Sequence, residues 1–185
     1  MRTRHRALTA LAMASLVAFP LAACGNEGEE KPTEAATQEA PPSQDPADAT
    51  PQERIEAYFE ASDAAAAEGW KDSSYADDYL VPELAEKQKA DDAERAETGT
   101  VITGDRKLSE WKIVNESGTA AEIEFCDDAT RLEASKAGKP VGLSDESPKL
   151  IAGFKLTRDP TSEPWMIQKK GYYDEGTSCE AYFTD

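Results

Sequence analysis

The spacing of apolar residues along the chain changes at Gly99, and this change narrows the possible folds to one class. Before Gly99 the large apolar residues recur every three or four positions, as on one face of a helix. After Gly99 they alternate with polar residues, as in half-buried strands. Helices followed by strands that short turns join are typical of an α+β fold with an antiparallel sheet, because parallel strands need a long crossover between them. Residues 51–185 are enough for one such domain with its own core.

Three helices are predicted in the first part of this domain. Thr50 is a favourable N-cap, Pro51 suits the first helical position, and Glu53 stands where a capping box needs an acid, so the first helix begins at Pro51. Further helices are expected over 73–80 and 82–97. The last of these has few large apolar groups, and we expect it to be mostly solvated.

Four strands are predicted after the helices. The alternating segments cover 108–114, 120–126, 149–159 and 164–173. The sequences "NESGT" and "KAGKP" contain turn residues and are predicted to be turns.

The N-terminus carries the pattern of a secretory signal. Arg2, Arg4 and Arg6 precede an apolar stretch that is slightly too short to span a membrane as a helix. That stretch ends in Leu21-Ala22-Ala23-Cys24, which resembles the lipobox of bacterial lipoprotein precursors. The resemblance implies that residues 1–23 are a signal peptide and that Cys24 receives a diacylglyceryl group. Since two acyl chains anchor a protein stably, we expect a cell-membrane protein held on the extracytoplasmic face.

Residues 24–50 form the predicted tether. They contain four prolines, many acids and no aromatic or branched aliphatic residue, so they cannot bury enough apolar surface to fold. Removal of residues 1–23 takes away three arginines and no acid, which leaves 17 basic and 37 acidic residues and a net charge of −20. Such a chain is repelled by nucleic acid, and no basic stripe or base-stacking ladder offsets that repulsion. We therefore expect no nucleic-acid partner.

Cys126 and Cys179 remain after the lipidated cysteine. In an exported protein the surroundings are oxidising, so an even pair of cysteines predicts a disulfide bond. The alternative is a redox or nucleophilic thiol. The pair lacks CxxC spacing, and the mature chain has no histidine that could activate a thiol.

Several of these features together resemble one family. The lipobox, the acidic tether, the helix "YFEASDAAAAEGW", and the segments "FCDD" and "KAGKPV" are similar to actinobacterial lipoproteins with a nuclear transport factor-like, cystatin-like cone domain. The resemblance implies a strongly curved antiparallel sheet wrapped around the N-terminal helices. In that superfamily some members are enzymes, many are binding or dimerisation modules, and many have no assigned activity.

The residues available for chemistry are few. The single histidine, His5, leaves with the signal peptide, which excludes histidine-based acid–base catalysis and histidine-held zinc. An isomerase- or dehydratase-like reaction would need a carboxylate base and a tyrosine donor. The candidate groups are Asp63, Asp127, Tyr58, Tyr75 and Tyr79. We interpret Asp127 and Asp128 as capping or solvating a strand end and the tyrosines as core residues whose hydroxyls reach the rim. We predict no catalytic residues and no cofactor.

Metal binding is not indicated either. The pairs Asp77–Asp78 and Asp91–Asp92 lack the alternating oxygen ligands and the glycine of a calcium loop. We interpret both pairs as solvated helix faces.

Two functions other than catalysis remain. The first is a lipid-anchored interaction or accessory domain with an unidentified envelope protein as its partner. The second is a cone that holds a small apolar ligand between the first helix and the sheet. The aromatic residues of that predicted pocket, which would otherwise be plain core, are Tyr58, Phe59, Trp70, Trp111, Phe125 and Phe154.

Overall fold

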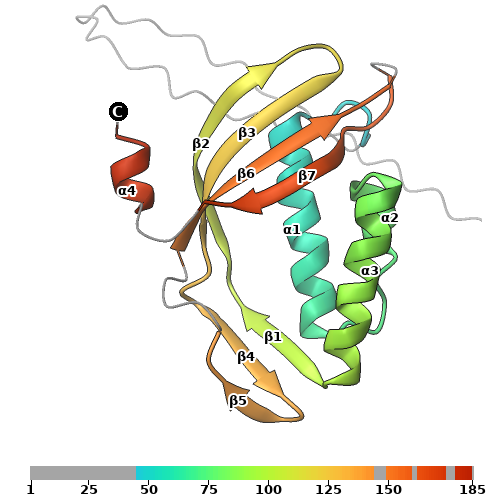
Figure 1. The fold of residues 1–185 in the computed structure, drawn as a ribbon, viewed down its shortest axis with the longest axis vertical. Helices are drawn as coiled ribbons and strands as arrows, with labels where there is room; N and C mark the ends of the chain where they lie inside the picture. Colours follow the sequence, from blue (N-terminus) through green and yellow to red (C-terminus); the bar gives the residue numbers. More distant parts are fainter. Residues whose placement is uncertain (1–44, 144–148, 160–161, 174–177, 185) are drawn as a thin grey trace, which may run out of the picture. The chain divides into compact units, whose positions relative to one another are not determined.

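The computed structural model describes residues 45–143, 149–159, 162–173 and 178–184 (Figure 1). Cys24, the predicted signal peptide and most of the predicted tether lie outside these residues. The elements, in chain order, are α1 (Pro51–Ala67), α2 (Tyr75–Tyr79), α3 (Pro82–Glu97), β1 (Thr100–Gly104), β2 (Lys107–Glu116), β3 (Ala120–Asp128), β4 (Leu132–Lys136), β5 (Lys139–Val141), β6 (Lys149–Thr157), β7 (Met166–Tyr172) and α4 (Cys179–Tyr182).

Helix α1 begins as the sequence predicts. The Thr50 side chain accepts a hydrogen bond from the Glu53 amide, and the Glu53 carboxylate accepts one from the Thr50 amide at 2.7 Å. This capping box satisfies two backbone donors that a helix start leaves free. Ala49, directly before the cap, is buried.

The strands form two antiparallel sheets. The four predicted strands correspond to β2, β3, β6 and β7, which pair in the order β2-β3-β6-β7. The second sheet, in the order β1-β4-β5, was not expected from the sequence. The predicted turn "KAGKP" lies within it, because Ala137 and Gly138 take positive φ and reverse the chain between β4 and β5. The fold is therefore α+β with two antiparallel sheets.

The inner face of the four-stranded sheet packs against the helices. Phe125 of β3 and Phe154 of β6 lie on that face, and the ring of Phe59 from α1 contacts both at centroid distances of 5.9 and 5.7 Å. Tyr58 and Ile55 from α1 complete the contact with the sheet. Burial of these large side chains stabilises the domain by roughly 1.5–3 kcal/mol for each fully buried residue.

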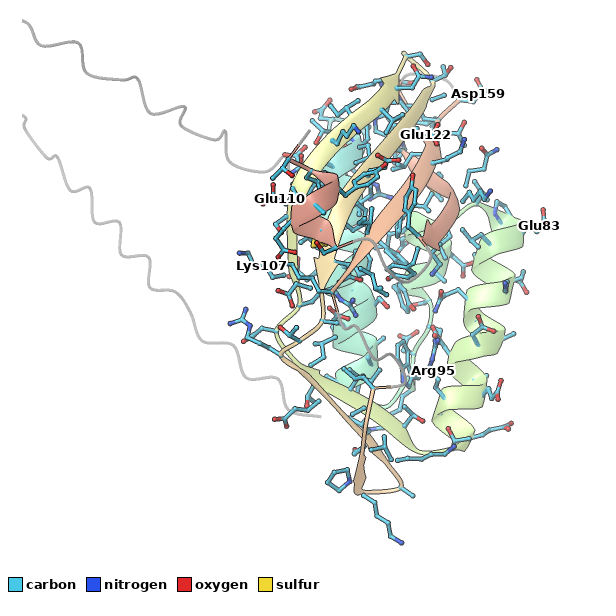
Figure 2. All side chains as sticks on the ribbon, turned by 60° about the vertical axis from the view of Figure 1, so that its left-hand side comes forward. Glu83, Arg95, Lys107, Glu110, Glu122 and Asp159 are labelled. Atoms are coloured by element: carbon cyan, nitrogen blue, oxygen red, sulfur yellow. A yellow bond between two sulfur atoms is a disulfide. The ribbon has the colours of Figure 1, made fainter. Side chains whose placement is uncertain are left out.

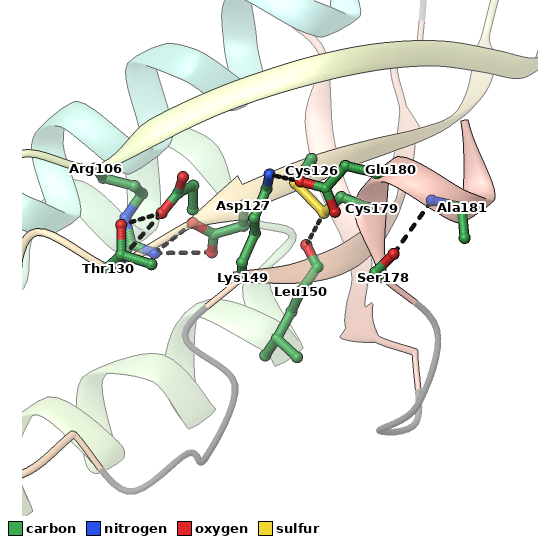
Figure 3. The surroundings of a disulfide bond; sticks show 11 residues. Arg106, Cys126, Asp127, Thr130, Lys149, Leu150, Ser178, Cys179, Glu180 and Ala181 are labelled. Atoms are coloured by element: carbon green, nitrogen blue, oxygen red, sulfur yellow. Dashed lines mark hydrogen bonds and ion pairs between the residues drawn. A yellow bond between two sulfur atoms is a disulfide. The ribbon is translucent and has the colours of Figure 1, made fainter. Parts of the chain in front are cut away.

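The outer face of the same sheet carries the disulfide bond. Cys126 of β3 bonds to Cys179 at the start of α4, across 53 residues of chain, with a Cα–Cα distance of 5.7 Å (Figure 3). This confirms the predicted pair. Ile151 lies beneath the bond, and Tyr182 and Phe183 pack around it. The disulfide thus holds the last described helix on the face opposite the main core.

None of the helices in the described ranges combines the length and the apolar composition that a membrane crossing requires.

Candidate functional site

Arg106 occupies the connection between the two sheets. It lies between the end of β1 at Gly104 and the start of β2 at Lys107. Gly104 has a φ of 110°, and a Cβ at that position would collide with the carbonyl oxygen of Arg131. Glycine is therefore required for the bend that precedes Arg106.

The guanidinium of Arg106 binds two carboxylates at once. Its Nε and Nη2 donate to Asp63 of α1 at 2.9 and 3.1 Å, and its Nη1 donates to both oxygens of Asp127 of β3 at 2.9 and 2.7 Å. The side chains are 17%, 28% and 4% exposed for Arg106, Asp63 and Asp127. Burial alone would lower the pKa of Arg106, but the hydrogen bonds and charges of Asp63 and Asp127 outweigh it and raise that pKa.

Tyr172 of β7 completes this group. Its hydroxyl donates to Asp127 at 2.9 Å, and burial of the hydroxyl together with the charge of Asp127 raises the pKa of Tyr172. We call Asp63, Arg106, Asp127 and Tyr172 the Arg106 cluster. Its two acids and one base leave one net negative charge. The sequence analysis considered both aspartates but missed Arg106 and Tyr172, which no local pattern marks.

Cavities lie on both sides of the Arg106 cluster. One, of about 410 Å³, is acidic, because Glu56, Glu60 and Asp105 line it beside Asp63 and Arg106. The other, of about 190 Å³, has Arg106, Asp127 and Tyr172 among its lining residues. Its apolar walls are Ile102, Leu132, Leu143 and Leu150. We call the second one the Arg106 cavity.

The Arg106 cavity borders a larger hollow. That hollow, of about 640 Å³, shares Ala129, Leu132 and Leu143 with it and extends along β4 and β5. Apolar walls and a few convergent polar groups are typical of small-molecule sites.

A second buried polar group surrounds Asp92 of α3. Asp92 is fully buried and accepts hydrogen bonds from the Tyr75 hydroxyl at 2.9 Å, from Gln88 at 2.8 Å and from Arg95 at 2.8 Å. The interpretation of Asp91–Asp92 as a solvated pair was therefore wrong for Asp92. Its carboxylate is stable there because three donors replace the water that burial removes.

Lys170 of β7 reaches the same group from the sheet. It is paired with Phe154 in the β6–β7 ladder, and its ammonium donates to the Tyr58 hydroxyl and to Gln88. Burial lowers the pKa of Lys170 to about 8, against the opposing influence of the nearby Asp92 charge.

The six aromatic residues of the predicted pocket do not line one cavity. Tyr58, Phe59, Phe125, Phe154 and Trp111 belong to the packed core, where Trp111 stacks on Phe125 at 4.6 Å. Among the cavities described above, Phe59 lines the acidic one, and none of the other five lines any of them.

Trp70 lies apart from the other five, at the end of α1. It has a φ of 60°, its ring lies under Arg95 at 4.9 Å, and its buried Nε1 has no hydrogen-bond partner among the described residues.

The tyrosines and aspartates considered for catalysis are also engaged. Tyr75 donates to Asp92, and Tyr79 lies under the Arg54 guanidinium at 4.4 Å. Within the described ranges, no three Asp, Glu, His or Cys side chains are grouped closely enough to hold a metal ion.

Comparisons with known proteins give little further guidance. No protein-family model and no curated protein matches this chain. A solved structure, the intermembrane space region of the chloroplast protein ARC6, is similar at a TM-score of 0.45 and 13% sequence identity, over 65% of this chain and 92% of that one. A likeness this weak carries no argument about function.

Replacement of Arg106 tests the Arg106 cluster. We expect Arg106→Met to lower the free energy of unfolding by about 3–5 kcal/mol, because it leaves two carboxylates half-buried without their partner. Urea denaturation at neutral pH measures this loss.

The matched control for this test is Arg131→Met, which removes an exposed arginine from the turn directly before β4. It should change stability by less than about 0.5 kcal/mol. Equal effects of the two variants would contradict a structural role of Arg106.

The lowered pKa of Lys170 predicts that the free energy of unfolding rises with pH. Its pKa is about 8 in the folded chain, whereas an unfolded lysine has a pKa of about 10.4. Between these values the unfolded chain binds one more proton, so the free energy of unfolding increases as the pH rises from about 8 to about 10. Lys170→Met should abolish this increase and Lys139→Met, at an exposed lysine of β5, should keep it. Denaturation curves at several pH values measure the slope, and an equal slope in both variants would contradict the assignment.

Proposed function

We propose that this chain is a lipid-anchored, extracytoplasmic domain that binds a partner and does not catalyse a reaction. The anchor rests on the lipobox-like sequence that ends at Cys24 and on the acidic tether that follows it. The excess of acids argues against nucleic acid as the partner and favours an envelope protein.

The observation that carries the non-catalytic part is the pairing of Asp63 and Asp127 by Arg106. A general base needs a free lone pair that faces the substrate. Asp127 accepts hydrogen bonds at both oxygens, from Arg106 and Tyr172, and is 4% exposed. Asp63 binds the same guanidinium through both of its oxygens. The two carboxylates thus share the guanidinium of Arg106 as their counterion, and this pairing occupies the oxygens that a general base would need.

We further propose that the domain is a cone of the nuclear transport factor-like, cystatin-like kind. Helix α1 lies against the inner face of the four-stranded sheet, as in such a cone. Register shifts in β2 and β6 support the curvature, because bulges bend and twist a strand.

A second candidate function is the binding of a small, mainly apolar molecule. The Arg106 cavity favours it, since Ile102, Leu132 and Leu150 face the polar groups of Arg106 and Asp127 there. Its polar end, formed by Arg106, Asp127 and Tyr172, would suit a ligand that carries a polar group.

The anchor is tested by Cys24→Ser. We expect the variant to leave the membrane fraction and appear in the soluble extracytoplasmic fraction, because no thiol remains for the acyl chains. The control is Ser43→Ala, in the same predicted tether, and this variant should stay in the membrane fraction. Fractionation followed by immunoblotting measures this, and unchanged fractionation of Cys24→Ser would refute the anchor.

Native mass spectrometry decides between the two candidate functions. The full chain, purified from its natural host without denaturant, should show extra mass that is lost on unfolding if the Arg106 cavity holds a ligand. Ala129→Phe, which fills the cavity wall, should then lose that mass, whereas Ala93→Phe, on the exposed face of α3, should keep it. A bare mass of the unaltered chain would rule out the ligand and leave the envelope partner.

A further inference from the structure

The outer face of the β6–β7 pair contains a groove that none of the sites above uses. Gly153 of β6 lies directly opposite Gly171 of β7, and Lys155 lies directly opposite Lys169. Since alternate residues of a strand share a face, all four belong to one face. It is the outer face, because Phe154 points into the core from the position between Gly153 and Lys155.

The paired glycines hollow this face. The groove has a volume of about 360 Å³ and is also lined by Glu122, Tyr172 and Tyr173. At Gly153 a Cβ would lie in ordinary contact with the Tyr173 ring, at 3.4 Å. At Gly171 a Cβ would meet nothing within 4 Å. A glycine in a strand costs stability, and one of the places where it occurs is where a ligand approaches the backbone closely.

The paired lysines leave a positive charge in the groove. Like charges directly opposite each other destabilise a sheet. Glu122, labelled in Figure 2, binds Lys155 at 3.1 Å, but within the described residues no acid forms an ion pair with Lys169. This is notable in a chain with 37 acidic and 20 basic residues. The groove therefore carries one positive charge, that of Lys169, which no ion pair among the described residues balances.

The groove also has an aromatic wall, formed by the ring of Tyr173, which is 43% exposed. The Tyr173 hydroxyl is bonded to Glu124, which also accepts a hydrogen bond from Tyr182 of α4 at 2.8 Å, so the ring is held in place beside the groove. A fixed aromatic face favours flat, apolar groups that stack on it.

We infer that this groove binds a small anion, in which a carboxylate or phosphate group is carried on a flat apolar body. The anionic group would lie between the ammonium groups of Lys155 and Lys169, and the flat body would lie over Gly171 against Tyr173. Binding would remove the repulsion between the two lysines. The inference goes beyond the proposed function, because Cys24 and the charged groups Asp63, Arg106 and Asp127 take no part in it.

Titration of the full, ¹⁵N-labelled chain with benzoate and with phenyl phosphate tests the inference. We expect saturable shifts of the Lys169 and Gly171 amide resonances with at least one of the two, and none with the neutral benzyl alcohol. Lys169→Gln should weaken binding at least tenfold. A response to benzoate alone assigns a carboxylate ligand, a response to phenyl phosphate alone assigns a phosphate ligand, and a response to both supports the shared chemistry.

Two further variants make the test specific. Gly171→Val fills the groove and should abolish binding, while its thermal midpoint stays equal or rises because valine favours strands and nothing obstructs it. If that variant does not fold, Gly171→Ala takes its place, with a smaller but measurable loss. Lys139→Gln removes an exposed positive charge elsewhere and should leave binding unchanged.

Two results would overturn the inference. One is the absence of saturable shifts at Lys169 and Gly171 up to roughly 20 mM of either anion, well above a millimolar dissociation constant. The other is an equal loss of binding in Lys139→Gln, which would mean unspecific attraction. Since the anchor is tested by fractionation, failure here is distinguishable from failure of the proposed function.

Discussion

The neutralisation of charge around Arg106 is the constraint on which the arrangement of this domain depends. Arg106 stands between β1 and β2, and its two partners come from α1 and β3. One guanidinium therefore joins the first helix, the main sheet and the chain segment that leads from the second sheet. Because a buried carboxylate without a partner is strongly destabilising, Asp63 and Asp127 require these elements to meet at Arg106. Such a cluster adds less to the free energy of folding than to the specificity with which these elements take one arrangement.

The two faces of the main sheet differ in how far other parts of the domain cover them. The inner face is apolar at its centre, where Phe59 packs on Phe125 and Phe154, and polar at its margins, where the Arg106 cluster and Lys170 lie. The outer face is only partly covered, by α4 and its disulfide bond. The rest of that face keeps the groove of Gly153, Lys155, Lys169 and Gly171 accessible.

The sequence predicts those elements whose cause is local. Thr50 and Glu53 form their capping box within one helical turn, the four strands of the main sheet show alternation, and the even pair of cysteines that remains after Cys24 predicts the disulfide bond. The second sheet escapes prediction because β5 has three exposed residues, one of them proline, and no buried alternation. Arg106 and Asp92 escape for another reason, since each stands in a charged stretch whose pattern is that of a solvated surface. Only the tertiary fold brings Asp63 and Asp127 to Arg106. Asp92 has Gln88 and Arg95 as partners on its own helix, but its third partner, Tyr75, comes from α2, and the packing that buries Asp92 is tertiary.

The difference between paired charges in the interior and unpaired charge at the surface also bears on where a charged ligand can be recognised. In the interior of the described domain the charged groups have partners: Asp92 has three donors, Asp127 has Arg106 and Tyr172, and Lys170 has Tyr58 and Gln88. A site whose polar groups already satisfy one another gains little from an incoming charged ligand, because each new hydrogen bond replaces an existing one. Uncompensated charge remains at Lys169, on the outer face. An anion that binds there exchanges lysine–lysine repulsion for attraction without breaking any of the buried pairs, so the fold favours charge recognition outside the interior of the domain.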